Sequence, residues 1–195
     1  NLSSGGLQGA SHFYETIDNT GNSFPAPLGG AVPLMSAARA ANGTVGFAYF
    51  FHDNSGAAFP DSKLYYGIRA GSATSPVFSN RWVTNHLEGS SALLAAGLSP
   101  SLVYDANSNP IIAYQNATTA NTSNDTNLVV ARSGNGGISF SQTTVDDTPA
   151  AVVGLYPSAA VYGTAIGVAY QDFTNTGLKF ARWTPSGQWK TYFVD

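Results

Sequence analysis

The sequence contains no cysteine and few charged residues. The absence of cysteine excludes disulfides, thiolate catalysis and cysteine-ligated metal centres. Charged residues make up 10% of the 195 residues, well under the roughly 25% of an average soluble domain. With 8 basic and 11 acidic side chains, the chain has no basic excess that would bind a phosphate backbone. No run approaches the roughly 18 apolar residues of a membrane span. We therefore expect neither nucleic-acid binding nor a membrane span.

The residues that are present favour a secreted protein with a substantial core. Hydrophobic residues reach 43%, and serine, threonine, asparagine and glycine are abundant. This composition, with low charge and no cysteine, is typical of extracellular or cell-surface proteins. It therefore predicts an extracellular location.

A unit of four segments recurs along the chain. Its first two segments, joined by a polar turn, end close to an Ala-Tyr pair and occupy 32–49, 99–115 and 156–172. A third segment begins with leucine, at 64–69, 128–132 and 178–182, and a fourth follows at 81–85, 140–146 and 189–195. The segments are short and rich in Val, Ile, Tyr and Phe, which is typical of β-strands.

Four short strands per unit predict one blade of a β-propeller. The second segment of each unit is apolar on both faces, as expected for a blade packed between two neighbours. We predict an all-β chain with about three four-stranded antiparallel blades, at 32–90, 91–149 and 150–195, in one domain over 1–195. Residues 1–31 are expected to hold an extra outer strand of a preceding blade, at 12–18, and a linker.

Three blades do not close a ring that needs about four to eight. We therefore expect the chain to be part of a larger or multi-chain propeller. It is either a fragment or processed piece of a longer protein, which we favour, or one of several chains in the ring. In both cases further blades, from missing sequence or from other chains, complete it.

Three sets of residues recur from unit to unit, which favours structural roles. The tyrosines of the Ala-Tyr pairs are expected in the core, with hydroxyls bonded to a neighbour. An aspartate or asparagine that ends the fourth segment is expected to cap backbone N–H groups rather than to bind a metal or sugar. An arginine that ends the third segment is expected to belong to the scaffold. The sets are Tyr49, Tyr114 and Tyr170; Asp18, Asn85, Asp146 and Asp195; and Arg69, Arg132 and Arg182.

The turn before the fourth segment of the second unit, residues 133–140, reads S-G-N-G-G-I-S-F. It resembles the Asp box of bacterial neuraminidase repeats, S-x-D-x-G-x-x-W, with asparagine for the aspartate and phenylalanine for the tryptophan. The repeated unit as a whole resembles the tandem repeats of bacterial secreted β-propellers akin to this family. That resemblance covers nearly the whole chain, most closely residues 97–146 and 154–195, and implies a β-propeller fold. Because such propellers host many functions, it implies sialidase-like glycoside hydrolysis only as one alternative.

A binding site is expected on one rim, formed by the loops between the second and third segments and those entering the first. Aromatic rings cover the apolar C–H surface of a sugar or peptide while amides and carboxylates fix its polar groups. The sequence thus predicts an extracellular, non-catalytic binding module for a carbohydrate or protein partner. The candidate ligand-binding residues are His52, Asp53, Tyr156, Asp172 and Phe173.

Catalytic residues are not predicted. Glycoside hydrolysis requires two convergent carboxylates, and the chain has only Glu15 and Glu88 besides aspartates that fall mostly in turns. Neither a metal nor a cofactor is expected. His52 and Asp53 are too few for a metal centre. The loops rich in Asn and Asp could hold calcium, but the sequence contains no D-x-[DN]-x-[DN]-G loop that would support it. A sialidase-like hydrolase, or a fragment of one, and a structural subunit of a larger assembly remain the alternatives.

Overall fold

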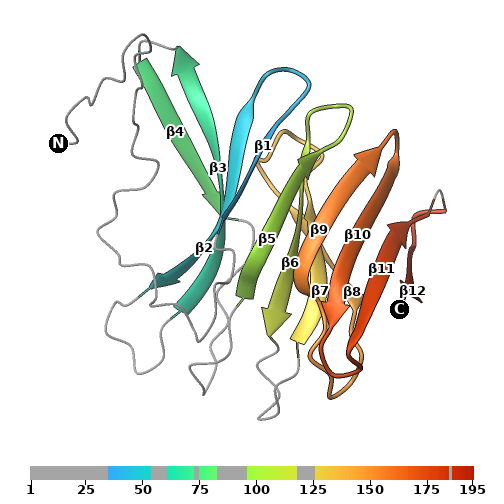
Figure 1. The fold of residues 1–195 in the computed structure, drawn as a ribbon. Helices are drawn as coiled ribbons and strands as arrows, with labels where there is room; N and C mark the ends of the chain where they lie inside the picture. Colours follow the sequence, from blue (N-terminus) through green and yellow to red (C-terminus); the bar gives the residue numbers. More distant parts are fainter. Residues whose placement is uncertain (1–34, 54–60, 73–74, 83–95, 118–125, 185) are drawn as a thin grey trace, which may run out of the picture.

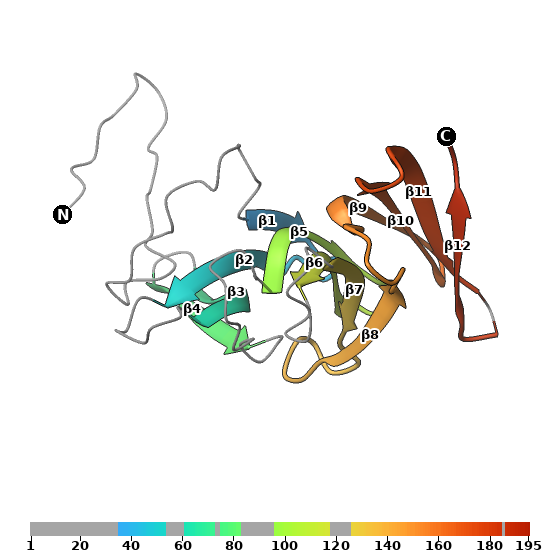
Figure 2. The same cartoon turned by 90° about the horizontal axis from the view of Figure 1, so that it is seen from below.

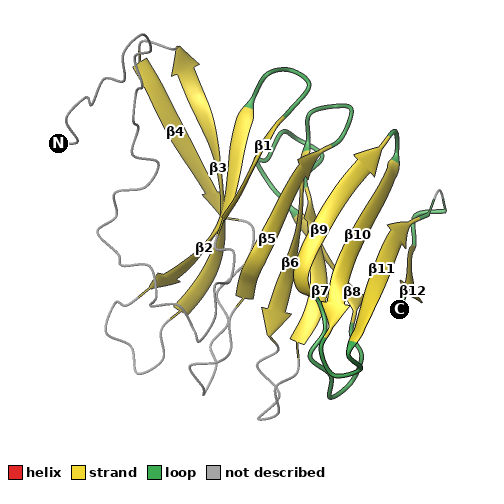
Figure 3. Cartoon of the chain, in the orientation of Figure 1, coloured by secondary structure: helices red, strands yellow, loops and turns green. Residues whose placement is uncertain are grey.

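The computed structural model describes residues 35–53, 61–72, 75–82, 96–117, 126–184 and 186–195. These residues form strands joined by turns and contain no helix (Figure 3), which confirms the all-β prediction. In these ranges there is accordingly no helix that could cross a membrane. The strand expected at 12–18 lies outside the described residues.

The strands form three four-stranded antiparallel sheets, each running in chain order from its first strand to its last (Figure 1). The first sheet contains β1 (Met35–Arg39), β2 (Val45–Asp53), β3 (Asp61–Ser72) and β4 (Ser75–Trp82). The second contains β5 (Ala96–Tyr104), β6 (Pro110–Ala117), β7 (Thr126–Arg132) and β8 (Ser141–Asp146). The third contains β9 (Leu155–Tyr162), β10 (Ala165–Asp172), β11 (Gly177–Trp183) and β12 (Trp189–Phe193). Each expected unit thus contains one sheet.

Short polar turns connect the first two strands of each sheet. Gly43 adopts a φ of 89°, a left-handed conformation that glycine tolerates without a steric penalty. Between β5 and β6, the carboxylate of Asp105 accepts the backbone N–H groups of Asn107 at 2.9 Å and Asn109 at 2.8 Å. Local hydrogen bonds of this kind, and the positive φ that glycine tolerates, explain why Asn, Asp and Gly occur in the turns between strands.

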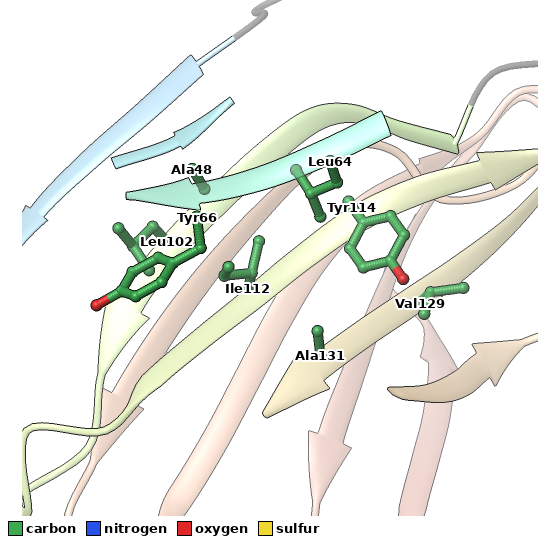
Figure 4. Packing of buried hydrophobic residues seen from close by; sticks show 8 residues of the cluster. All are labelled: Ala48, Leu64, Tyr66, Leu102, Ile112, Tyr114, Val129 and Ala131. Atoms are coloured by element: carbon green, nitrogen blue, oxygen red, sulfur yellow. The ribbon is translucent and has the colours of Figure 1, made fainter. Parts of the chain in front are cut away.

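The sheets stack face to face, with the second between the other two (Figure 2). Figure 4 shows the apolar cluster between the first and second sheets, and a matching cluster joins the second and third. Neighbouring residues of β6 serve different clusters, because Ile112 faces the first sheet and Ile111 the third. This alternation explains why the segment is apolar on both faces. Tyr49, Tyr114 and Tyr170 are all buried, as predicted.

A serine near the start of the first sheet and another near the start of the second each bind the sheet that follows. The backbone N–H of Leu102 donates to Ser36 Oγ at 3.0 Å, and that of Ala159 donates to Ser101 Oγ at 2.9 Å. The first strands β1, β5 and β9 lie in contact along the stack, while the outer strands fan apart (Figure 2). The sheets are therefore arranged like blades, although the described residues do not form a closed ring.

The strand registers correct one prediction. Ile111 pairs with Arg132 and Gly167 with Arg182, whereas in the first sheet the equivalent Gly46 pairs with Ile68. Arg69 is therefore one position out of step, because its segment has one residue more after the shared leucine. The recurring arginine is a feature of the second and third sheets only.

Candidate functional site

The five predicted site residues lie near the edge that is lowest in Figure 1, on two different sheets. Tyr156, Asp172 and Phe173 belong to the third sheet, where the start of β9 pairs with the end of β10. His52 and Asp53 are the last two residues of β2, where their backbones pair with Ser62 and Asp61. The second sheet separates the two groups, so the structure brings together only the three on the third sheet.

Two aromatic rings project from the lower edge of the third sheet. Phe173 is 60% exposed and Tyr156 is 51% exposed. Tyr156 has a φ of 50° and is followed by Pro157, and the equivalent Ser99, also followed by a proline, has a φ of 51°. A left-handed residue before proline is unfavourable, so its repetition at the start of two sheets marks a built-in kink of the backbone. In the third sheet this kink presents the tyrosine ring.

The backbone beneath the rings is held by hydrogen bonds between two connections. The N–H of Phe173 donates to the carbonyl of Val152 at 2.9 Å, and the N–H of Val152 donates to Thr174 Oγ1 at 2.8 Å. The same connection reaches the second sheet, where Thr126 Oγ1 donates to the carbonyl of Val153 at 2.8 Å. Phe173 is therefore anchored to the connection between β8 and β9, which is itself bound to the second sheet, and not to β10 alone.

Gly154 permits this close approach. A Cβ at this position would lie 2.7 Å from the carbonyl oxygen of Asn127 and from the backbone nitrogen of Leu128. The φ of Gly154 is 78°, which also disfavours any side chain. A glycine is required where the connection between β8 and β9 passes over β7.

A buried polar cluster lies between the second and third sheets. The carboxylate of Asp146, at the end of β8, accepts a hydrogen bond from Tyr170 Oη at 2.6 Å and forms an ion pair with Lys179 Nζ at 2.5 Å. Lys179 Nζ also lies 3.7 Å from Asp172 Oδ2. All these side chains are buried. The cluster joins two strands of the third sheet to the last strand of the second.

The surroundings of Asp146 favour its charged form. Burial alone would raise the pKa of this carboxyl group, but hydrogen bonds from Lys179, Tyr170 and Thr148 outweigh burial and lower the pKa. Burial and the nearby Asp146 carboxylate raise the pKa of the Tyr170 phenol. Asp146 was expected to cap backbone N–H groups; within the described ranges its partners are instead side chains, mainly of the next sheet. Asp146 therefore joins two sheets, whereas Asp18 and Asn85 lie outside the described residues and Asp195 is exposed.

Asp172 has a structural role in its own turn. Its side chain is 0% exposed, and its carboxylate accepts the backbone N–H of Asn175 at 3.0 Å and the side-chain amide of the same residue at 2.9 Å. Direct contact between this carboxylate and a ligand would require the turn to open. Phe173 and Tyr156 need no such change, since both rings are already exposed.

The turn that resembles an Asp box is closed by its own side chains. Ser133 Oγ accepts the N–H of Gly137 at 2.8 Å, and Asn135 Oδ1 accepts the N–H of Ser139 at 3.0 Å. The ring of Phe140, in the position of the box tryptophan, packs edge-on against Tyr66 of the first sheet with ring centroids 5.4 Å apart. Asparagine therefore closes this turn without the aspartate of the motif, and membership of the Asp-box family stays a prediction.

Two features of the contacts between sheets escape reasoning from the sequence. The Arg132 guanidinium lies 4.5 Å from the centre of the Trp183 ring in the next sheet. Lys179 occupies the register position of Tyr65 and Val129, which are aromatic or apolar. Val129 faces the neighbouring first sheet, whereas Tyr65 lies on the face of the first sheet that is turned away from the second. Comparison with the second unit is therefore the signal that this lysine faces another sheet.

The described residues offer little for hydrolysis or metal binding. Asp146 and Asp172 share the cation Lys179 in the interior, and the lowered pKa of Asp146 does not suit a general acid. Across the described ranges, no group of three or more His, Cys, Asp or Glu could hold a metal ion. No known family model matches the chain, and no curated protein matches it.

Proposed function

We propose that this chain is a non-catalytic binding module, that its three sheets are successive blades of a β-propeller, and that it binds a carbohydrate on the lower edge of the third sheet. The observation that carries the proposal is the pair of exposed rings, Tyr156 and Phe173, on connections fixed by hydrogen bonds. A rigid aromatic surface covers the C–H face of a sugar ring at low conformational cost. Low charge and the absence of cysteine support an extracellular location.

The chemistry of the buried cluster supports binding over hydrolysis. A retaining or inverting glycosidase needs one carboxyl group with a raised pKa and a second carboxylate facing the same bond. Asp146 has the opposite tendency, and Asp172 is fully enclosed. Both aspartates therefore support the fold beneath the exposed rings.

A glycan array tests the proposal directly. The unmodified protein is expected to bind a small set of glycans, and Tyr156→Ala and Phe173→Ala are each expected to reduce that binding by at least about tenfold, since burying one aromatic ring contributes about 1.5–3 kcal/mol. Tyr162→Ala is the matched control, because Tyr162 is an exposed aromatic residue at the opposite end of β9.

Three results would contradict the proposal. Silence across the array would favour a protein partner, and binding that both substitutions leave unchanged would place the ligand elsewhere. Turnover of a fluorogenic sialoside would assign hydrolase activity instead.

A further inference from the structure

The face of the third sheet that points away from the second sheet exposes apolar side chains. Leu178 is 45% exposed there, whereas the equivalent Leu64 and Leu128 are 0% exposed because another sheet covers them. A shallow cavity of about 250 Å³ opens on the same face, between the rings of Tyr162 and Phe180 and next to Gly167. We call this surface the open face.

The open face repeats, position by position, the face of the first sheet that the second sheet covers. The strand registers align Ser158 with Ser36, Gly167 with Gly46, Leu178 with Leu64, and Phe180 with Tyr66. In both sheets an aromatic ring lies against the glycine. The two faces therefore have the same hydroxyl acceptor, the same leucine and the same shape at the glycine.

The covered face of the first sheet shows what such a surface receives. Ser36 Oγ accepts the backbone N–H of Leu102, and the hydroxyl of Tyr104 occupies the space that a Cβ at Gly46 would fill. That hydroxyl lies 2.9 Å from Tyr66 Oη. The backbone N–H of an edge strand and an inserted tyrosine side chain thus hold the second sheet on this face. On the open face, the serine and the cavity beside Gly167 stand in the corresponding places.

The contact between the second and third sheets supplies a further match. There Arg132 stacks on Trp183, and Asp146 binds Tyr170. Arg182 has the register position of Arg132, and Asp195 ends its unit as Asp146 does. Both Arg182 and Asp195 are exposed.

We propose that the open face binds a further four-stranded blade of the same repeat type, supplied by another polypeptide segment. This partner offers a backbone N–H to Ser158, a tyrosine to the cavity beside Gly167, and an aromatic ring to Arg182. The inference continues a contact already present twice in the chain. It rests on the proposed propeller arrangement but not on a carbohydrate ligand, because the open face does not include Tyr156 or Phe173.

An extended chain with a fourth unit tests the proposal. Residues 147–155 follow Asp195 as the connector, and a copy of residues 99–146 follows as the fourth unit, because the original of this unit covers the matching face of the first sheet. Hydroxyl-radical footprinting then reports the exposure of Leu178. We expect its oxidation to fall about tenfold relative to the unextended chain, toward that of its fully buried counterparts.

Gly167→Val in the extended chain fills the cavity and is expected to restore the oxidation of Leu178. Thr164→Val, in the exposed turn between β9 and β10, is the matched control and is expected to retain protection. If the copied unit does not fold, as judged by circular dichroism, a copy of residues 147–195 replaces it. In the unextended chain, the third sheet, which these residues form, contacts Ser101 and Arg132 of the second sheet.

Unchanged oxidation with both copies would overturn the proposal, as would protection that survives Gly167→Val. Sedimentation of the unextended chain tests whether a second copy of this chain supplies that blade. A dimer that Gly167→Val dissociates would support the proposal, because each copy carries four-stranded sheets of this type. Loss of glycan binding in the array experiment bears on Tyr156 and Phe173 alone and leaves this test independent.

Discussion

Replacement of Lys179 by methionine would remove the only positive charge of the described buried cluster while keeping most of the side-chain volume. Lys179 Nζ lies 2.5 Å from an Asp146 oxygen and 3.7 Å from an Asp172 oxygen. At an effective dielectric constant of about 20, two unit charges about 4 Å apart attract by about 4 kcal/mol. Desolvation offsets much of this attraction, and loss of one partner of a buried pair typically costs about 3–5 kcal/mol. We expect the free energy of unfolding at pH 7 to fall by that amount.

The loss is expected to depend on pH in a defined direction. In the unmodified protein the pKa of Asp146 is lowered, so its stabilisation is complete above the ordinary value of about 3.9 and is lost as the pH falls through the lower folded-state value. Without Lys179, burial becomes the dominant influence and raises this pKa. The resulting penalty is present at neutral pH and disappears as the pH falls below the raised value. The two proteins should therefore converge in stability toward acid pH.

Urea unfolding followed by tryptophan fluorescence at pH 7 and at pH 4 measures both effects. Thermal unfolding at pH 7 gives a second measure: the melting temperature of Lys179→Met should fall by about 6–20 °C, given about 2–4 °C per kcal/mol for a domain of this size. Lys190→Met, at an exposed position of the same sheet, is the control and should change stability by less than about 0.5 kcal/mol. A Lys179→Met protein within about 1 kcal/mol of the unmodified one, or a deficit that grows on acidification, would refute the reasoning.

Two further substitutions test contacts in and around the second sheet. Gly46→Ala places a methyl group where the Tyr104 hydroxyl lies, and overpacking of this kind costs about 1–3 kcal/mol; combination with Tyr104→Phe should recover part of the loss in urea unfolding, whereas strict additivity would argue against the contact. Ser133→Ala leaves the N–H groups of Asn135 and Gly137 without their acceptor and should destabilise the protein by about 1–3 kcal/mol by the same assay. A neutral Ser133→Ala would show that the turn does not depend on its serine.

The repeated pattern predicts strands and burial well because each unit samples the same environment. The Ala-Tyr pairs correctly predict that Tyr114 and Tyr170 are buried, because the same pattern of apolar residues surrounds the pair in successive units. The arginine set was wrong for Arg69, because one added residue after the shared leucine places it one position beyond Ile68, the equivalent of Arg132 and Arg182. Alignment of the units on the arginine itself hides this added residue, whereas alignment on the paired strands reveals it.

Two features could not be predicted from the sequence for a different reason: the buried cluster around Lys179, and the separation of the predicted site residues onto two sheets. Lysine is almost never buried without a partner, so the apolar Val129 at the same repeat position is a weak sign of burial for Lys179 until Asp146 is known to lie opposite it. His52 and Phe173 occupy similar places in their units, but their separation by the second sheet depends on stacking order. The local pattern of each unit carries no information about that order.

Because the ion pair of Lys179 is confined to one seam, the units of this chain are not interchangeable. In a shuffled polypeptide with the third unit directly after the first, the preceding unit would supply Asn85, which bears no charge, where the sequence repeat has Asp146. The lysine would then lose its nearer carboxylate and keep only that of Asp172, 3.7 Å away in its own unit. The units are alike in shape, but only the second unit supplies the carboxylate of Asp146 to Lys179. This one charged side chain therefore favours the order in which the third unit follows the second. Recombination among tandem copies, a common accident in repetitive genes, would be penalised at this one residue.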